Sequence, residues 1–404
     1  MRRIKKYWRV FISLFLIIAS KLQKRKENRI AFGAWKGELY IDNSRYLLET
    51  ALKMLGEDYR FVWIGNKEVA AQLPHDSRIC CYEKNSLRSL SALLKCKYMF
   101  CSQMHYEDLS NYNVFEGAII TYLHHGCPVK RWGDDAGTGQ SINPSWQDRI
   151  VGKRRLLDYF VCSSETHFRT NLSSMKSWGC NEKNNLRTGT PRNDMLLLEN
   201  DEEHILKYKQ KYAEMLGFDV NQKVVLYVPT FRRSGIANES LVYRDSKEKE
   251  RLSELLHKHN CVLIEKAHYA GEFESKEGKS YDNILSCPKK VNIQEMLLFT
   301  DCMISDYSGA FLDYSILDRP IIHYIYDYEF YRDVDSGLYY ELKEFQAGSA
   351  ARNYDELLNA LESCLTDPKT GEELRRKVKN KFMEYEQGNA SEQIIGSVLR
   401  KETV

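Results

Sequence analysis

Short apolar runs alternate with amphipathic segments along most of this chain, and this alternation limits its fold more than any other feature. Continuous runs of Val, Ile, Leu, Phe and Tyr are typical of strands that are buried on both faces. Segments with apolar residues at helical spacing separate these runs. Because parallel strands need a crossover between them, strand and helix in turn predict an α/β fold with parallel sheets.

The alternation occurs in two series. The first series of expected strands covers residues 29–35, 60–65, 98–102, 118–126 and 159–164, with helices at 43–55 and 165–179. After a charged helical segment at 201–216, the second series follows at 223–231, 261–268, 302–306 and 320–326. A chain of 404 residues is also too long for one ordinary core. We therefore predict a leader at 1–28, an N-terminal α/β domain at 29–200, and a C-terminal α/β domain at 201–404 that includes the C-terminal helices.

The leader combines positive charge with a short apolar run. Residues 1–29 carry ten Lys or Arg side chains and one acidic residue, whereas the whole chain has a net charge of only +3, so residues 30–404 are net acidic. The apolar run at 10–19 is half as long as the roughly 20 residues of a spanning helix. We expect a helix that lies peripherally on an anionic membrane surface, at its cytoplasmic face. A cleaved signal peptide and a buried or flexible leader are the alternatives.

Two further features limit the possible cellular compartment and the possible classes of binding partner. Eleven cysteines at irregular spacing include no CxxC pair, which favours reduced thiols in a cytosolic setting and disfavours export. The basic residues of the leader flank an apolar plug and do not line one face, so no nucleic-acid partner is expected.

Polar residues that follow the expected strands share one chemistry. They are His124, His125, Lys130 and Arg131; Arg192, Asn193 and Asp194; Thr230, Arg232 and Arg233; Lys266 and His268; and Ser305, Asp306, Tyr307, Ser308 and Gly309. Ligands of open parallel sheets bind beyond the carboxyl ends of the strands. Cations, hydroxyls and histidines gathered there are typical of a phosphate site. The chain has no GxxxxGK(S/T) loop and no GxGxxG motif that opens a helix, which disfavours P-loop and dinucleotide-binding proteins.

The stretch CMISDYSGAFLDYS gives the most specific signal. A strand is expected to end at Ser305, Asp306 or Ser308 can cap the next helix, and Gly309 lets the backbone approach a ligand. Free amides at such a helix start favour a diphosphate. An ordinary capped helix of an α/β unit is the alternative interpretation.

Six motifs occur in an order that is similar to a known family. HHGCPVKRWG, GTPRNDML, YVPTFR, KAHY, ISDYSGAFLDYS and YIYDYEFYRDVDSGLYYEL, with the opening FGAWKGELYIDNSRYLLE, resemble the CDP-glycerol glycerophosphotransferase family, the primases and polymerases of teichoic acid synthesis. The resemblance extends from about residue 29 to about residue 385.

The resemblance implies a GT-B-like pair of Rossmann-type parallel-sheet domains that face a central cleft, attached to the cytoplasmic side of a membrane. The implied donor is CDP-glycerol or a related CDP-polyol. The implied acceptor is a hydroxyl of a lipid-linked saccharide or of a teichoic-acid or capsule-type polymer, and transfer of the polyol phosphate releases CMP. The motifs identify no cofactor, the metal requirement stays open, and a divalent cation such as Mg²⁺ is an option for the diphosphate.

The resemblance and the chemistry of the reaction together assign roles to residues. The two histidines of the family fall on His125, expected as the general base, and on His268, expected to stabilise phosphate charge and to protonate the leaving CMP. His124 is expected to point away from His125 and to pack. The expected positions for binding the donor and its phosphates are Lys130, Arg192, Pro229, Thr230, Arg232, Lys266, Ser305, Asp306, Tyr307, Ser308, Gly309 and Asp313.

Departures and alternatives accompany this assignment. Cys127 stands where family members often carry Thr, and Gly309 stands where they often carry a second Ser, which concerns the choice of donor. A GT-B glycosyltransferase or epimerase that uses a nucleotide sugar would share the fold and the diphosphate-binding helix. A non-catalytic, membrane-associated assembly protein would not depend on His125 and His268.

Overall fold

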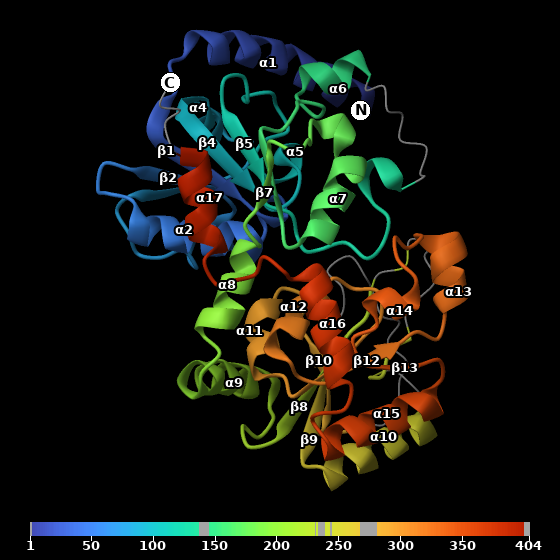
Figure 1. The fold of residues 1–404 in the computed structure, drawn as a ribbon. Helices are drawn as coiled ribbons and strands as arrows, with labels where there is room; N and C mark the ends of the chain where they lie inside the picture. Colours follow the sequence, from blue (N-terminus) through green and yellow to red (C-terminus); the bar gives the residue numbers. More distant parts are fainter. Residues whose placement is uncertain are drawn as a thin grey trace. The chain divides into compact units, whose positions relative to one another are not determined.

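The computed structural model describes residues 2–136, 145–230, 232, 239–242, 245–266 and 281–399. These residues form two compact units (Figure 1). Unit 1 contains Met1–His125, Gly133–Asp194 and Tyr385–Val404, and unit 2 contains Gly126–Trp132 and Met195–Glu384. The chain therefore enters each unit more than once.

Unit 1 is built on a seven-stranded parallel sheet with the order β3-β2-β1-β4-β5-β6-β7. Its strands are β1 (Lys26–Gly33), β2 (Arg60–Ile64), β3 (Ile79–Tyr82), β4 (Cys96–Cys101), β5 (Ile119–Tyr122), β6 (Tyr159–Cys162) and β7 (Asn185–Arg187). Its helices are α1 (Arg2–Leu22), α2 (Asp42–Met54), α3 (Lys67–Ala70), α4 (Leu87–Lys95), α5 (His105–Asp108), α6 (Trp146–Ile150), α7 (Glu165–Ser174) and α17 (Ala390–Leu399), and α8 (Pro191–Leu198) begins here and ends in unit 2. The strand order reverses between β1 and β4, so the loops after these strands are the place where a ligand is expected.

Unit 2 has a six-stranded parallel sheet with the order β10-β9-β8-β11-β12-β13. Its strands are β8 (Lys223–Val228), β9 (Cys261–Lys266), β10 (Ile284–Cys287), β11 (Cys302–Ser305), β12 (Ile321–Tyr324) and β13 (Ser349–Ala351). Its helices are α9 (Glu202–Leu216), α10 (Ser246–Lys258), α11 (Ile293–Phe299), α12 (Ala310–Tyr314), α13 (Tyr328–Phe330), α14 (Leu342–Phe345), α15 (Tyr354–Thr366) and α16 (Glu372–Phe382). The reversal lies between β8 and β11. The prediction of two parallel-sheet α/β domains is confirmed.

Short helical turns occur in both units, four of the tight 3₁₀ type and one of the wider π type among the described residues. They are η1 (Trp35–Gly37), η2 (Gly133–Asp135), η3 (Lys176–Trp178), η4 (Ser315–Leu317) and the π-helical η5 (Tyr331–Asp335). The cores lie on the sheets, as the apolar runs predicted. In unit 1, for example, Phe32 of β1 stacks on Phe100 of β4 with ring centroids 5.4 Å apart. All eleven cysteines are free thiols.

The C-terminal helix differs from the sequence expectation. We expected α17 in the C-terminal domain, but it belongs to unit 1 and packs beside α2 (Figure 1). Ile394 and Ile395 lie in the apolar core of unit 1. The Asp194 carboxylate accepts the N–H groups of Ala390 and Ser391, each at 2.8 Å, and so caps α17. Unit 1 accordingly ends after Asp194, earlier than the expected boundary at 200, and regains the chain at its C-terminal end.

The leader folds as one helix on unit 1. α1 buries Val10 and Leu16, and the Ser13 hydroxyl accepts the N–H of Asn113 at 3.1 Å. Arg25, just after α1, donates to four backbone carbonyl groups of unit 1. Among the described helices, none has both the length and the apolar character needed to cross a bilayer.

Candidate active site

The loops after β8 and β11 meet where the strand order of unit 2 reverses. Thr230 follows β8, and its N–H and hydroxyl donate to the carboxylate of Asp306 at 3.0 and 2.6 Å. The Ser305 hydroxyl donates to the Val228 carbonyl at 3.0 Å. Pro229, which stands between Val228 and Thr230 in the sequence, is buried. These bonds join the ends of two adjacent strands. The described residues of the predicted motifs YVPTFR and ISDYSG therefore lie at one place.

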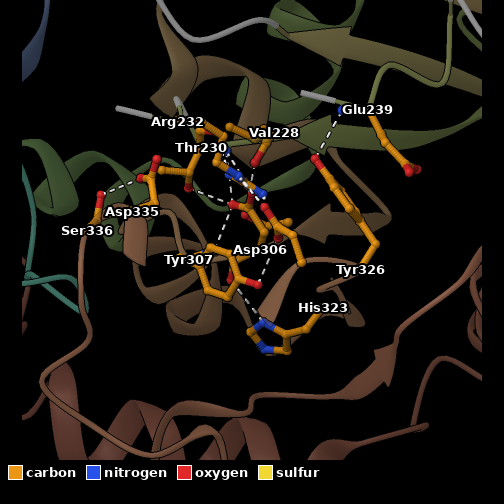
Figure 2. Close-up of polar contacts among 12 residues, drawn as sticks. Val228, Thr230, Arg232, Glu239, Asp306, Tyr307, His323, Tyr326, Asp335 and Ser336 are labelled. Carbon is orange, nitrogen blue, oxygen red and sulfur yellow. Dashed lines mark hydrogen bonds and ion pairs between the residues drawn. The ribbon is translucent and has the colours of Figure 1, made fainter. Parts of the chain in front are cut away.

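Arg232 is the centre of a buried ion-pair network (Figure 2). Its Nη1 donates to Asp306 at 2.7 Å and to the Thr230 carbonyl at 2.6 Å, and its Nε and Nη2 donate to Asp327 at 2.7 and 3.1 Å. The side chain is 1% exposed, and its guanidinium carbon lies 4.9 Å from the ring centroid of Tyr331. Burial alone would lower the pKa of Arg232, but the carboxylates of Asp306 and Asp327 raise it above its ordinary value.

This network changes the expected role of Arg232. A phosphate clamp needs guanidinium N–H groups that face an open site, whereas this guanidinium is enclosed by two carboxylates, a carbonyl and aromatic rings. The structure therefore gives Arg232 the task of holding the two loops in place and does not support its expected contact with the donor phosphates.

A buried histidine fixes the turn after β11. Nε2 of His323 accepts the N–H of Ala347 at 2.9 Å, so the proton of the neutral ring is on Nδ1, which donates to the Asp306 carbonyl at 3.3 Å. Burial lowers the pKa of His323 to about 4. The next residue, Tyr307, stacks on Tyr331 with ring centroids 4.0 Å apart. Asp306 and Tyr307 are thus held through both backbone and side chains.

Backbone amides are available at the start of α12. In the described part of the chain, the N–H groups of Ser308 and Gly309 donate to no protein acceptor, and both residues are partly exposed. The Ser308 hydroxyl accepts the N–H of Ala310 at 3.3 Å. A Cβ added at Gly309 would lie 3.1 Å from the carbonyl oxygen of Cys127, so glycine permits this close approach. This turn keeps the features that were predicted to favour a diphosphate.

Two side chains of unit 2 that were expected to contact the CDP-activated donor are largely buried. Lys266 ends β9, is 8% exposed and donates to the Lys289 carbonyl at 3.4 Å. Burial lowers the pKa of Lys266. Asp313 is 2% exposed and accepts Nε2 of Gln294 at 3.2 Å. The Asp313 side chain thus lies between α12 and α11, and the structure does not support its expected contact with the CDP-activated donor.

The remaining positions divide into described and undescribed ones. Lys130 lies in the Gly126–Trp132 segment of unit 2 and forms an antiparallel bridge with Leu338. His268 and Arg233 lie outside the described residues, so the role of His268 stays a prediction.

His125 is exposed at the carboxyl end of β5. The strand ends at Tyr122, sooner than the predicted end at 126, and His124 then adopts a left-handed backbone conformation with φ +65°. The His124 side chain is 1% exposed, and its ring lies against His167 with centroids 4.8 Å apart. As expected, His124 packs and His125 is exposed, but the His124 ring does not point away from His125, because the two ring centroids lie 5.7 Å apart. The difference in exposure results from the turn at His124. Strand alternation is not its cause, because β5 ends at Tyr122 and does not continue to residue 126.

Asn43 holds this turn, and sequence reasoning gave it no role. Its Nδ2 donates to the carbonyls of Leu123 and His124 at 3.1 and 2.7 Å, and its Oδ1 accepts the N–H of Arg192 at 2.9 Å. Arg192 is buried and pairs with Asp42 at 3.2 Å. The structure therefore does not support Arg192 as a phosphate contact. The signal for Asn43 was its place in the IDNS stretch of the opening motif.

The GTPRND motif anchors the C-terminal segment. The carboxylate of Glu386 accepts the N–H and hydroxyl of Thr190, at 3.1 and 2.9 Å, and Nδ2 of Asn193 at 3.1 Å. This motif is therefore structural in the described chain.

Strained backbone conformations occur in the loops after β1 and β5, which form the ligand edge of unit 1. Trp35, Lys36, Asp42 and His124 have φ between +45° and +67°, and all four follow β1 or β5. Such conformations cost about 1–3 kcal/mol each and cluster at functional sites. Among the described residues, no group of three or more His, Cys, Asp and Glu side chains could hold a metal ion, and the optional Mg²⁺ stays a prediction.

Residues 15–400 match the family described as CDP-Glycerol:Poly(glycerophosphate) glycerophosphotransferase. The chain belongs to this family. It is 26% identical over 403 residues to the teichoic acid poly(glycerol phosphate) polymerase of Bacillus spizizenii, with 97% of this chain and 96% of the relative covered. It is 26% identical over 390 residues to the teichoic acid glycerol-phosphate transferase of Staphylococcus aureus, with 95% of each covered. The solved structure of the wall teichoic acid polymerase TagF is similar in fold, with a TM-score of 0.75, 20% identity, and 98% and 97% of the two chains covered.

These comparisons confirm the predicted resemblance, the GT-B-like fold and the enzyme class. As a member of this family, the protein is a CDP-glycerol glycerophosphotransferase, and its donor is CDP-glycerol.

Replacement of Arg232 by Ala should destabilise unit 2 by about 3–5 kcal/mol, because Asp306 would stay buried without its counter-ion. Arg232→Lys should restore little stability, since an ammonium group cannot bridge two carboxylates as a planar fork does. The matched control is Arg251→Ala, which removes an exposed ion pair with Asp355 and should leave the unfolding midpoint nearly unchanged. Urea unfolding measures these effects. A stable Arg232→Ala protein with a raised KM for CDP-glycerol would instead identify a phosphate clamp.

Acid should destabilise the protein through its buried histidines. Burial lowers the pKa of His105 and His323 to about 4 and that of His167 to about 3. An unfolded His titrates near 6.5, so between about pH 6.5 and 4 the unfolded chain binds protons that the folded protein does not, and stability falls as the pH falls. Buried Asp108, whose pKa burial raises to about 7, offsets part of this loss.

Urea midpoints at pH 7.5, 6.5, 5.5 and 5.0 test this expectation. The Asp108→Asn variant should show a steeper loss over this range than the parent protein, because the offset is gone. A stability that is constant or rises on acidification would contradict the neutral state of these histidines.

Proposed function

We propose that this protein transfers glycerol phosphate from CDP-glycerol to a hydroxyl of a lipid-linked saccharide or teichoic-acid-type polymer, with release of CMP, at the cytoplasmic face of a membrane. Family membership supports the donor and the type of reaction. The names of the two relatives, a poly(glycerol phosphate) polymerase and a glycerol-phosphate transferase of teichoic acid, support the class of acceptor.

The proposed reaction breaks the bond between CMP and the phosphorus next to glycerol. The acceptor hydroxyl attacks this phosphorus, loses its proton to a base, and takes over the glycerol phosphate. Such a transfer needs a base of near-neutral pKa and positive potential around the phosphates. His125 is the proposed base because it is the exposed member of the pair. His124 is not accessible to a substrate hydroxyl, because its side chain is 1% exposed, and the same burial holds its pKa well below the ordinary value.

The observation that carries this assignment is the contact of the His125 motif with the start of α12. Cys127, two residues after His125, lies against Gly309 within unit 2. Within unit 2, the segment that follows His125 in the chain therefore lies at the start of α12, and we assign the amides of Ser308 and Gly309 to the diphosphate. His268 and Lys266 are proposed to add positive charge, with His268 as the acid for CMP.

The exposed face of α1 supports attachment to a membrane. Opposite its buried face, α1 carries an apolar stripe that consists of Tyr7, Trp8, Phe11, Leu14, Phe15, Ile18 and Leu22, all between 45% and 83% exposed. α6 packs beside α1, exposes Trp146 and continues into the basic residues Arg149, Lys153 and Arg154. An apolar stripe flanked by cations is typical of helices that lie in the interface of anionic lipid.

His125→Ala should lower CMP release from CDP-glycerol by about 10²–10⁴-fold, the usual contribution of a general base. A membrane extract supplies the acceptor, and CDP-ribitol and UDP-sugars are the alternative donors. The control is His204→Ala, because this ring is half-exposed and paired with Asp201 at 2.7 Å in unit 2. Its rate should equal that of the wild type.

Each other outcome identifies a different function. Release of UDP without CMP would favour a nucleotide-sugar transferase. Release of CMP that His125→Ala leaves unchanged would place the base elsewhere. An absence of release from every donor would favour the assembly protein.

The double variant Phe11→Ser, Phe15→Ser should bind vesicles that contain phosphatidylglycerol at least tenfold more weakly, since each buried aromatic side chain contributes about 1.5–3 kcal/mol. Flotation with such vesicles measures binding, and pure phosphatidylcholine vesicles should bind the wild type less because the basic leader lacks anionic partners. Leu206→Ser changes an exposed leucine of α9 and serves as the control. Equal binding of the double variant and the wild type would rule out α1 as the attachment.

A further inference from the structure

We infer that Asn43 is a positioning residue for the general base: its amide holds the peptide group that carries His125. This inference rests on the proposed function, because it takes His125 as the base. It adds a residue of α2, 82 positions earlier in the chain than His125, to the catalytic apparatus.

The contacts of Asn43 match its chemistry completely. The side chain is fully buried, and its Nδ2 has two protons that meet the carbonyls of Leu123 and His124 at 3.1 and 2.7 Å. Its Oδ1 meets the N–H of Arg192 at 2.9 Å. Two acceptors on one side and a donor on the other leave a single orientation for the amide. Neither Asp nor Leu, which are similar in size, could make the same three bonds.

The shorter of these bonds acts on His125 through the planarity of the peptide. The carbonyl oxygen of His124 and the nitrogen and Cα of His125 lie in one rigid plane. Asn43 therefore fixes the direction in which the chain enters His125. The turn needs such a restraint, because His124 has φ +65°, a conformation that costs a residue with a side chain about 1–2 kcal/mol.

Asn43 is itself held at both ends. Its backbone N–H donates to the Asp42 carboxylate at 2.9 Å, and Asp42 also accepts Nε1 of Trp35 at 3.0 Å. The next residue, Ser44, donates its hydroxyl proton to the Gly33 carbonyl at 2.7 Å. Asn43 lies in α2, which Ser44 anchors to the end of β1, and its amide is thus a rigid support for the turn at the end of β5. A misplacement of about 1 Å at a reacting group can cost about 100-fold in rate.

The test compares Asn43→Asp, Asn43→Ala and His125→Ala in CMP release from CDP-glycerol. Asn43→Asp keeps the volume and an acceptor for Arg192 but removes both protons. We expect its kcat to fall about 10–100-fold with a KM for CDP-glycerol within about threefold of the wild type. Asn43→Ala should show the same split without an added charge, and provides the test should the Asp variant fail to fold. Asn283→Asp is the control, because Asn283 is equally buried, in unit 2, and bonds Ser253 at 2.9 Å.

A double-mutant cycle separates positioning from a general loss of structure. If Asn43 acts through His125, Asn43→Asp should cost less than about twofold once His125 is already Ala. Multiplied effects in the double variant, or a wild-type kcat in folded Asn43→Asp, would overturn the inference while His125→Ala still confirms the base. A His125→Ala protein of wild-type rate would overturn the proposed base and the role of Asn43 together.

Discussion

The side chains of Asn43 and Ser44 join the ends of three neighbouring strands, and the ligand edge of unit 1 depends on them. The Ser44 hydroxyl reaches the end of β1 and lies 2.9 Å from the hydroxyl of Ser102, just after β4, while Asn43 reaches the end of β5. Parallel strands have no hairpin turns to hold their ends in register. Two residues at the start of one helix supply that restraint here, so the geometry of His125 is fixed by a dipeptide that precedes it by about 80 positions.

In unit 2, an ion-pair network holds the loops at the ends of the strands. Arg232 lies between Asp306 and Asp327, and removal of Arg232 would leave the buried carboxylate of Asp306 without its counter-ion. In each unit, one arginine that was expected to bind phosphate is buried and paired with a carboxylate, Arg192 in unit 1 and Arg232 in unit 2. Among the described residues of these loops, the imidazole of His125 is exposed, and the amides of Ser308 and Gly309 donate to no protein acceptor. Backbone amides bind an anion without a cost of side-chain ordering, which fits the proposed diphosphate site.

The sequence predicted the central strands and missed β3, β7, β10 and β13, for a physical reason. These four are the edge strands of the two sheets and have only three or four residues each. A short edge strand is not buried on both faces and lacks the continuous apolar run that identifies a central strand. Motif order located His125 and the turn after β11. It could not show that Arg232 has a partner 95 residues later, or that α17 returns to Asp194, because nothing local in the sequence encodes such distant pairs.

The HHGCP motif owes its form to its position where the chain leaves unit 1. His125 is the last residue before the crossing, and its backbone is anchored by Asn43 through His124. The segment after it is anchored in unit 2, where the N–H of Tyr339 donates to the Val129 carbonyl at 2.9 Å. Gly126 stands at the junction with φ +125°, which a residue with a side chain rarely adopts. The glycine therefore permits the backbone conformation with which the chain leaves His125.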